Sequence, residues 1–79
     1  MIIKSDYKIS TSNDVIKSLL QNMKNTRKEM GITQSQLSSM TGIEQGAISK
    51  IETGKFNPSL LMLKRISDAL GKELVIKLV

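Results

Sequence analysis

The 79-residue sequence contains no cysteine and no histidine. The chain therefore has no disulfide cross-link, no thiol nucleophile and no ligands for the usual zinc fingers. Carboxylates alone can hold some metal ions, but here they are scattered without the spacing of a ligand set: Asp6, Asp14, Glu29, Glu44, Glu52, Asp68 and Glu73. We expect no metal site, no cofactor and no enzymatic activity.

Long apolar runs are absent as well. The N-terminus has Ile2 and Ile3, but it lacks the apolar core and the small-residue cleavage site of a secretion signal. No run approaches the roughly 20 apolar residues that a membrane-spanning helix needs. The sequence predicts a soluble, cytoplasmic protein with no membrane partner.

The size and charge of the chain narrow the class of protein further. A chain this short is expected to form one domain over residues 1–79, and it buries only about 60% of its unfolded surface, so help from a second subunit is expected. Twelve Lys and Arg residues against seven Asp and Glu residues give a formal net charge of +5. This excess favours a polyanionic partner.

Glycines divide the middle of the chain, about residues 13–71, into four predicted helices. Four of the five glycines follow a segment of apolar residues at helical spacing, where a left-handed C-terminal cap is favourable: Gly31, Gly42, Gly54 and Gly71. The first helix is expected over residues 13–30, with an apolar face made of Ile16, Leu19, Leu20, Met23 and Met30.

The other three helices have recognisable starts. Thr33 and Gln36 form a capping-box pattern before the second helix, Ile43 precedes the third, and Pro58 and Ser59 precede the fourth. Helical periodicity predicts that these helices bury Leu37, Met40, Ala47, Ile48, Ile51, Leu60, Leu63, Ile66 and Leu70. The third helix then keeps Gln45, Ser49, Lys50 and Glu52 on or near the surface.

Residues 73–79 break this helical pattern. The segment is short and rich in β-branched residues, with alternating side chains, and it predicts a strand. A single strand cannot satisfy its own backbone, so it needs a partner. The sequence leaves two partners open, the N-terminal segment of residues 2–9 or the same strand of a second subunit. Only the second pairing creates a dimer directly.

Four sequence patterns occur in a characteristic order: TQxxL, TGI, AISKIETGK and PSLLMLKRISDALG. In this order they resemble the helix-turn-helix domain of the Xre/Cro/cI-like repressors, over roughly residues 15–71. The resemblance implies a mainly α, four- to five-helix lambda-repressor-like DNA-binding domain, to which the chain adds a short C-terminal β-strand.

The C-terminal strand and the KIS segment before the first helix also resemble HipB-type antitoxins. That second resemblance implies a strand pair between the two subunits of a homodimer. The expected dimer interface is then Leu74, Val75, Ile76, Lys77 and Leu78.

The start of the third helix carries the candidate base contacts. A glutamine can bond adenine N6 and N7 together, and the resemblance implies a base contact at Gln45. Ser49 and Lys50 lie about one turn further along, and Glu44 can accept from cytosine N4. The alternative for Gln45 and Lys50 is an ordinary solvated side chain. Ser49 and Lys50 can reach either a base or the adjacent backbone, and Glu44 can instead favour the helix dipole while it lowers nonspecific affinity.

Candidate phosphate contacts flank these base contacts: Gln34, Ser35, Lys55 and Asn57. The alternative for Gln34 and Ser35 is helix capping alone, although Gln34 is also placed to brace Gln45. Lys24 and Lys28 on the first helix are weaker candidates, because a basic stripe at helical spacing is usually a solvated face. The resemblance further implies that Arg27 and Glu52 pair with each other and tie the first helix to the third.

Two positions depart from the family pattern. Glu44 stands where a better helix cap is common, and Gly46 costs about 1 kcal/mol relative to alanine inside a helix. Two explanations for Gly46 stay open. The missing side chain can let the helix backbone approach DNA closely, or position 46 can simply make no base contact.

These features predict a homodimeric, sequence-specific repressor that binds a palindromic operator in double-stranded DNA. An antitoxin that represses its own operon and also binds a toxin protein fits within this prediction. The alternatives are a protein-interaction module that mainly neutralises a toxin, and a regulator of a phage or mobile element.

Overall fold

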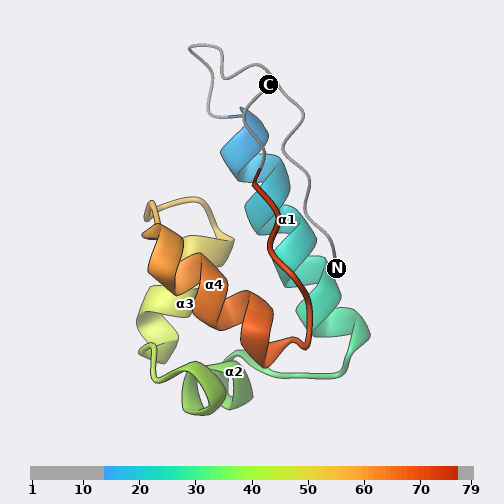
Figure 1. Cartoon of the computed structure of the whole chain (residues 1–79). Helices are drawn as coiled ribbons and strands as arrows, with labels where there is room; N and C mark the ends of the chain where they lie inside the picture. The colour runs from blue at the N-terminus through green and yellow to red at the C-terminus, as the bar shows by residue number, and fades with distance from the viewer. Residues whose placement is uncertain (1–13, 77–79) are drawn as a thin grey trace.

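A computed structural model describes residues 14–76 of the chain. This part folds into four helices, α1 (Asp14–Glu29), α2 (Gln34–Thr41), α3 (Gln45–Glu52) and α4 (Leu60–Ala69). The helix α2 packs against both α3 and α4, and α1 packs against α3 (Figure 1). The mainly α fold expected from the sequence is confirmed. No helix in residues 14–76 is long and apolar enough to cross a membrane.

The helix starts follow the predicted capping residues. The Thr33 hydroxyl accepts from the backbone N–H of Gln36 at 3.0 Å, and the Gln36 side chain accepts from the Thr33 N–H at 2.8 Å. This reciprocal pair is the expected capping box. At the start of α4, the Ser59 hydroxyl accepts from the backbone N–H of Met62 at 3.1 Å. Both helices therefore begin where the sequence places them.

The four glycines expected to end helices all have positive φ values, between 65° and 74°. Gly42, with a φ of 74°, caps the C-terminus of α2 and donates its N–H to the carbonyl of Ser38 at 2.9 Å. Glycine adopts this left-handed conformation without a side-chain clash. The chain can therefore reverse from α2 into α3 over a short turn.

The core draws residues from all four helices and from the turn between α2 and α3. Its buried members are Leu20, Met23, Leu37, Ile43, Ile48, Ile51, Leu63, Ile66 and Leu70. Ala47 is half-buried against this cluster. Burial of this kind is the main favourable term in folding, and here it fixes the orientation of α3 through its inner side.

Four residues predicted to be buried are instead exposed: Ile16, Met30, Met40 and Leu60. They lie at or just beyond helix ends. Periodicity gives the direction of a side chain but not the point at which the neighbouring helix stops. Met30 lies in the turn after α1, and Met40 is the last residue but one of α2.

The predicted C-terminal strand is not formed within the described residues. Only Leu74 takes part in an isolated β-bridge, and residues 73, 75 and 76 are in no regular element. Leu74 is half-buried against the core. A ladder needs a second strand, and residues 14–76 supply none. Lys77 and Leu78 lie outside the described residues, so the predicted strand pairing stays a prediction.

Candidate nucleic-acid interface

Side-chain hydrogen bonds fix the turn between α2 and α3. The Ser38 hydroxyl donates to the carbonyl of Ile43 at 2.6 Å, and the Thr41 hydroxyl accepts from the Ile43 N–H at 3.2 Å. Thr41 also donates to the Leu37 carbonyl at 2.8 Å. Ile43 itself is buried in the core. The two helices are therefore held in one relative orientation, as a helix-turn-helix requires.

The helix α3 has one buried side and one exposed side. Ile48 and Ile51 are buried, with 0% and 2% of their surface exposed. Gln45 and Lys50 are exposed, and Ser49 is half-buried. The packing of the apolar side thus leaves the predicted base contacts Gln45 and Lys50 open to a ligand, whereas Ser49 is less accessible.

Glu44 is the N-terminal cap residue of α3, but its side chain makes no capping hydrogen bond. The residue is exposed, and its φ of −56° and ψ of 142° place it just outside the helix. Its carboxylate is therefore not held by the helix end. It remains available to a ligand beside Gln45.

Two of the predicted phosphate contacts are at the start of α2. Ser35 is exposed, and Gln34 is half-buried. The Gln34 amide donates to Glu52 Oε1 at 2.9 Å, so it braces Glu52 rather than Gln45. The inward direction of the Gln34 amide makes Ser35 the more accessible of the two.

The loop after α3 holds the other two, Lys55 and Asn57, both of which are exposed. The backbone N–H of Lys55 donates to the carbonyl of Lys50 at 2.8 Å, which ties the loop to the end of the helix. Lys55 therefore starts from a fixed backbone position next to α3.

A buried ion pair between Arg27 and Glu52 connects α3 to α1 in the interior of the protein. The Nε of Arg27 lies 2.7 Å from Glu52 Oε2, and its Nη2 lies 2.9 Å from Oε1. The Nη1 donates to the carbonyl of Ile32 at 2.7 Å. Both side chains are less than a tenth exposed. One guanidinium therefore joins α1, the segment between α1 and α2, and α3.

The surroundings of Glu52 favour its charged form. Burial alone would raise the pKa of Glu52. The hydrogen bonds from Arg27 and Gln34, together with the positive charges of Arg27 and Lys24, outweigh burial and lower the pKa below its ordinary value.

Within residues 14–76, acidic side chains form no group of three that could hold a metal ion.

A family model described as helix-turn-helix matches residues 23–76. The chain belongs to this helix-turn-helix family. The match confirms the resemblance to Xre-like repressors and covers all of α2, α3 and α4. No solved structure gives a significant match.

Relatives of this helix-turn-helix protein carry regulator names. An HTH-type transcriptional regulator of Methanothermobacter thermautotrophicus is 43% identical over 47 residues, which are 60% of this chain and 68% of the relative. One from Haemophilus influenzae is 37% identical over 59 residues, which are 75% of this chain and 60% of the relative. The immunity repressor protein of Bacillus phage phi105 is 37% identical over 51 residues, which are 65% of this chain and 35% of the relative. Together they support a DNA-binding transcription regulator.

Sequence reasoning missed two features of this helix-turn-helix unit. The bond from Gln34 to Glu52 connects side chains 18 positions apart, and the bond from Arg27 to Ile32 uses a backbone carbonyl. A backbone acceptor has no residue signature. The capping box at Thr33 was the available signal, because it fixes the start of α2 and thereby the position of Gln34.

Proposed function

We propose that this protein is a sequence-specific transcriptional repressor that places α3 in the major groove of double-stranded DNA. The observation that carries the proposal is the exposed side of α3, on which Gln45 and Lys50 stand while Ile48 and Ile51 anchor the helix in the core. The major groove admits an α-helix and presents a distinct pattern for each base pair. Bound there, the protein would block transcription sterically and needs no cofactor.

Each polar residue has an assigned role in this proposal. Gln45 bonds adenine N6 and N7, Glu44 accepts from cytosine N4, and Lys50 and Ser49 reach further bases or the adjacent backbone. Phosphate contacts set the register of the protein on the duplex without specifying sequence, and they are assigned to Gln34, Ser35, Lys55 and Asn57. Because Gln34 is bonded to Glu52, its phosphate contact requires the backbone or a rearranged amide.

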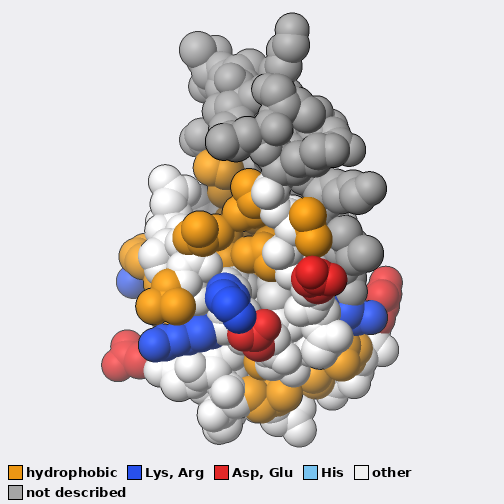
Figure 2. Space-filling view, viewed as in Figure 1, with side chains coloured by type: hydrophobic (Ala, Val, Ile, Leu, Met, Phe, Trp, Pro, Cys, Tyr) orange, Lys and Arg blue, Asp and Glu red, His pale blue; other side chains and the backbone are white. Residues whose placement is uncertain are grey.

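The proposed repressor acts as a homodimer on a palindromic operator, with half-sites about 10 bp apart or a multiple of that. An exposed apolar surface supports this state. It comprises Leu60, Leu61 and Ile76, each more than half exposed, together with Leu74. Figure 2 shows apolar side chains gathered over α4 and the segment after it. Patches of this kind commonly mark interaction sites.

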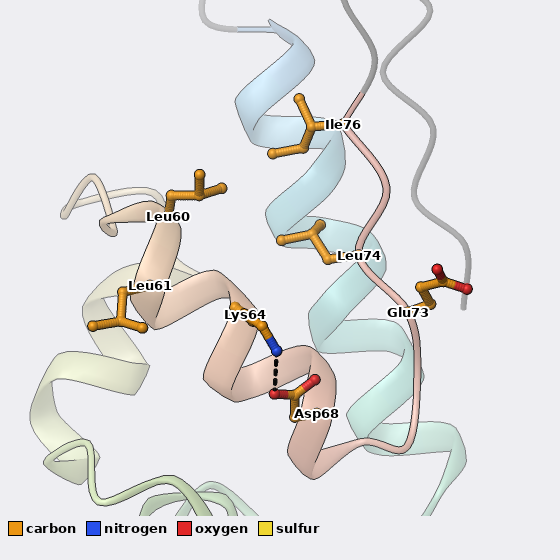
Figure 3. Close-up of a pocket in the computed structure, with 7 residues that line it drawn as sticks. All are labelled: Leu60, Leu61, Lys64, Asp68, Glu73, Leu74 and Ile76. Carbon is orange, nitrogen blue, oxygen red and sulfur yellow. Dashed lines mark hydrogen bonds and ion pairs between the residues drawn. The ribbon is translucent and has the colours of Figure 1, made fainter.

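A second copy of the chain is the occupant that fits this apolar surface. The apolar surface lines a groove whose polar residues are Lys64, Asp68 and Glu73. Lys64 pairs with Asp68 at 2.9 Å (Figure 3). A two-fold interface brings each residue against the other residues of the same patch, so it favours a rim that carries both signs of charge. Leu74 and Ile76 of this surface also belong to the predicted dimer strand.

Regulation of a mobile element is a second candidate, because the phi105 immunity repressor is among the relatives. The antitoxin role, with a toxin protein as additional partner, rests on the resemblance to HipB-type proteins. A toxin gene beside this gene, and a complex of the two products, would support that role. Neutralisation of a toxin without operator binding would instead favour the interaction module.

The decisive experiment selects duplexes from a random-sequence pool with the wild-type chain. We expect a palindromic sequence whose affinity falls steeply with salt concentration. The Gln45→Ala, Lys50→Ala double variant should lose this binding while circular dichroism shows an unchanged fold. Arg65→Ala removes a positive charge from an exposed position of α4 outside the proposed dimer groove, and it is the matched control, which should bind normally. Failure of the wild-type chain to select any duplex would sink the proposal.

A further inference from the structure

Gly46 is the glycine whose backbone conformation does not explain its presence. The other four have positive φ values, whereas Gly46 lies within α3 without one. Any L-residue adopts a helical conformation, and alanine does so more favourably because glycine loses more freedom on folding. The conformation of the chain therefore gives no reason for the missing side chain.

Packing gives no reason either. A Cβ atom built on Gly46 meets no atom within 4 Å, and the residue is exposed. The protein thus has room for a side chain at this position. Within the described residues, nothing in the free protein requires a glycine here.

The position of Gly46 on α3 indicates what its bare backbone faces. Residues three and four positions further along a helix share a face, so Gly46 lies on the same face as Ser49 and Lys50. It also follows Gln45 directly. Gly46 is therefore a gap in the side of the helix that carries the proposed base contacts.

The half-buried Ser49 indicates how closely the backbone of α3 must approach the base pairs. Ser49 carries its hydroxyl on a short side chain, and the residue is partly covered by the protein. A base contact from such a side chain needs the helix backbone close to the base pairs. A side chain at position 46, on the same face, would hold the helix away from the groove floor.

We propose that Gly46 is a clearance position that lets the backbone of α3 approach the base-pair edges closely. Its missing side chain sets the depth at which the helix docks and so decides whether Gln45 and Ser49 reach their bases. This inference rests on the proposed function, because it presupposes that α3 enters the major groove.

The test compares full-length Gly46→Ala and Gly46→Leu with the wild type, on a duplex that the wild type has selected from a random-sequence pool. Both variants should fold, and Gly46→Ala should raise the midpoint of thermal unfolding by roughly 2–6 °C. Affinity for the duplex should fall roughly tenfold with alanine and further with leucine, a loss on the scale of a mismatched base pair or more. If the affinity falls as the side chain at position 46 grows, while Gly46→Ala gains stability, the loss of affinity comes from the space that the side chain fills and not from a damaged fold.

Ser39→Ala and Ser39→Leu are the matched controls, since Ser39 is an exposed helical residue of α2. They should leave affinity within about twofold of the wild type. Wild-type affinity in Gly46→Leu would overturn the inference. An equal loss with alanine and leucine would also overturn it, because it would indicate a need for backbone freedom. If the wild type selects no duplex, the proposed function fails and this inference fails with it.

Discussion

The guanidinium of Arg27 donates hydrogen bonds to both carboxylate oxygens of Glu52, at 2.7 Å and 2.9 Å, and so connects α1 to α3 in the interior of the protein. Both side chains are less than a tenth exposed. Removal of one partner leaves the other charge buried and uncompensated, whereas removal of both does not. The pair is therefore a support for the position of α3.

Arg27→Met should destabilise the protein by about 3 kcal/mol, the scale observed when a buried ion pair loses one partner. The Arg27→Met, Glu52→Met double variant should recover much of that loss, because it buries no unpaired charge. Urea denaturation of the two variants and the wild type measures the difference. Equal destabilisation in the single and double variants would contradict this account.

The lowered pKa of Glu52 predicts a loss of stability in acid. A carboxylate with a depressed folded-state pKa adds stability that is fully present above its unfolded value, about 4.3. This stability is lost as pH falls through the lower folded value. Between about pH 6 and pH 3, the wild type should therefore lose more free energy of unfolding than Glu52→Gln, which cannot titrate here. Parallel pH profiles for the two proteins would rule out the linkage.

Ser67 on α4 is a target for stabilisation. The residue is 1% exposed, and its hydroxyl has no hydrogen-bond partner in the described part of the chain. Ser67→Ala removes a buried polar group that gains nothing in the folded state, and should add about 1 kcal/mol to the free energy of unfolding. Chemical denaturation measures the gain, with the exposed Ser39→Ala as control. A destabilised Ser67→Ala would reveal a bond that this hydroxyl makes.

The apolar surface on α4 predicts the oligomeric state. Leu60→Glu combined with Leu61→Glu should convert a dimer into a folded monomer, because both side chains are exposed and contribute little to the core. Sedimentation velocity measures the change. Met40→Glu is the matched control, with a similar exposure on α2. A monomeric wild type, or a double variant that still dimerises, would contradict the proposed interface.

Local sequence patterns determined the helices and their ends. Thr33, Gln36 and Ser59 hold their caps with side-chain bonds to residues three positions away. Gly42 ends α2 through its own left-handed backbone. Interactions over three or four residues depend only on the residue types and their spacing in the sequence, so the capping pattern and the helical period are sufficient to predict them. The family resemblance came from the same spacing.

Tertiary structure decided which apolar residues are buried and which polar residues are free. Met40 and Leu60 fit the helical period, yet both are exposed, and they lie at the ends of the short helices α2 and α4. The Gln34 amide turns inward to Glu52, a partner 18 residues away that no local pattern indicates. The sequence by itself thus specified α3 and its exposed side. The orientation of that helix, its support by the Arg27–Glu52 pair and the accessibility of its polar side chains depend on contacts between segments far apart in the chain, which only folding brings together.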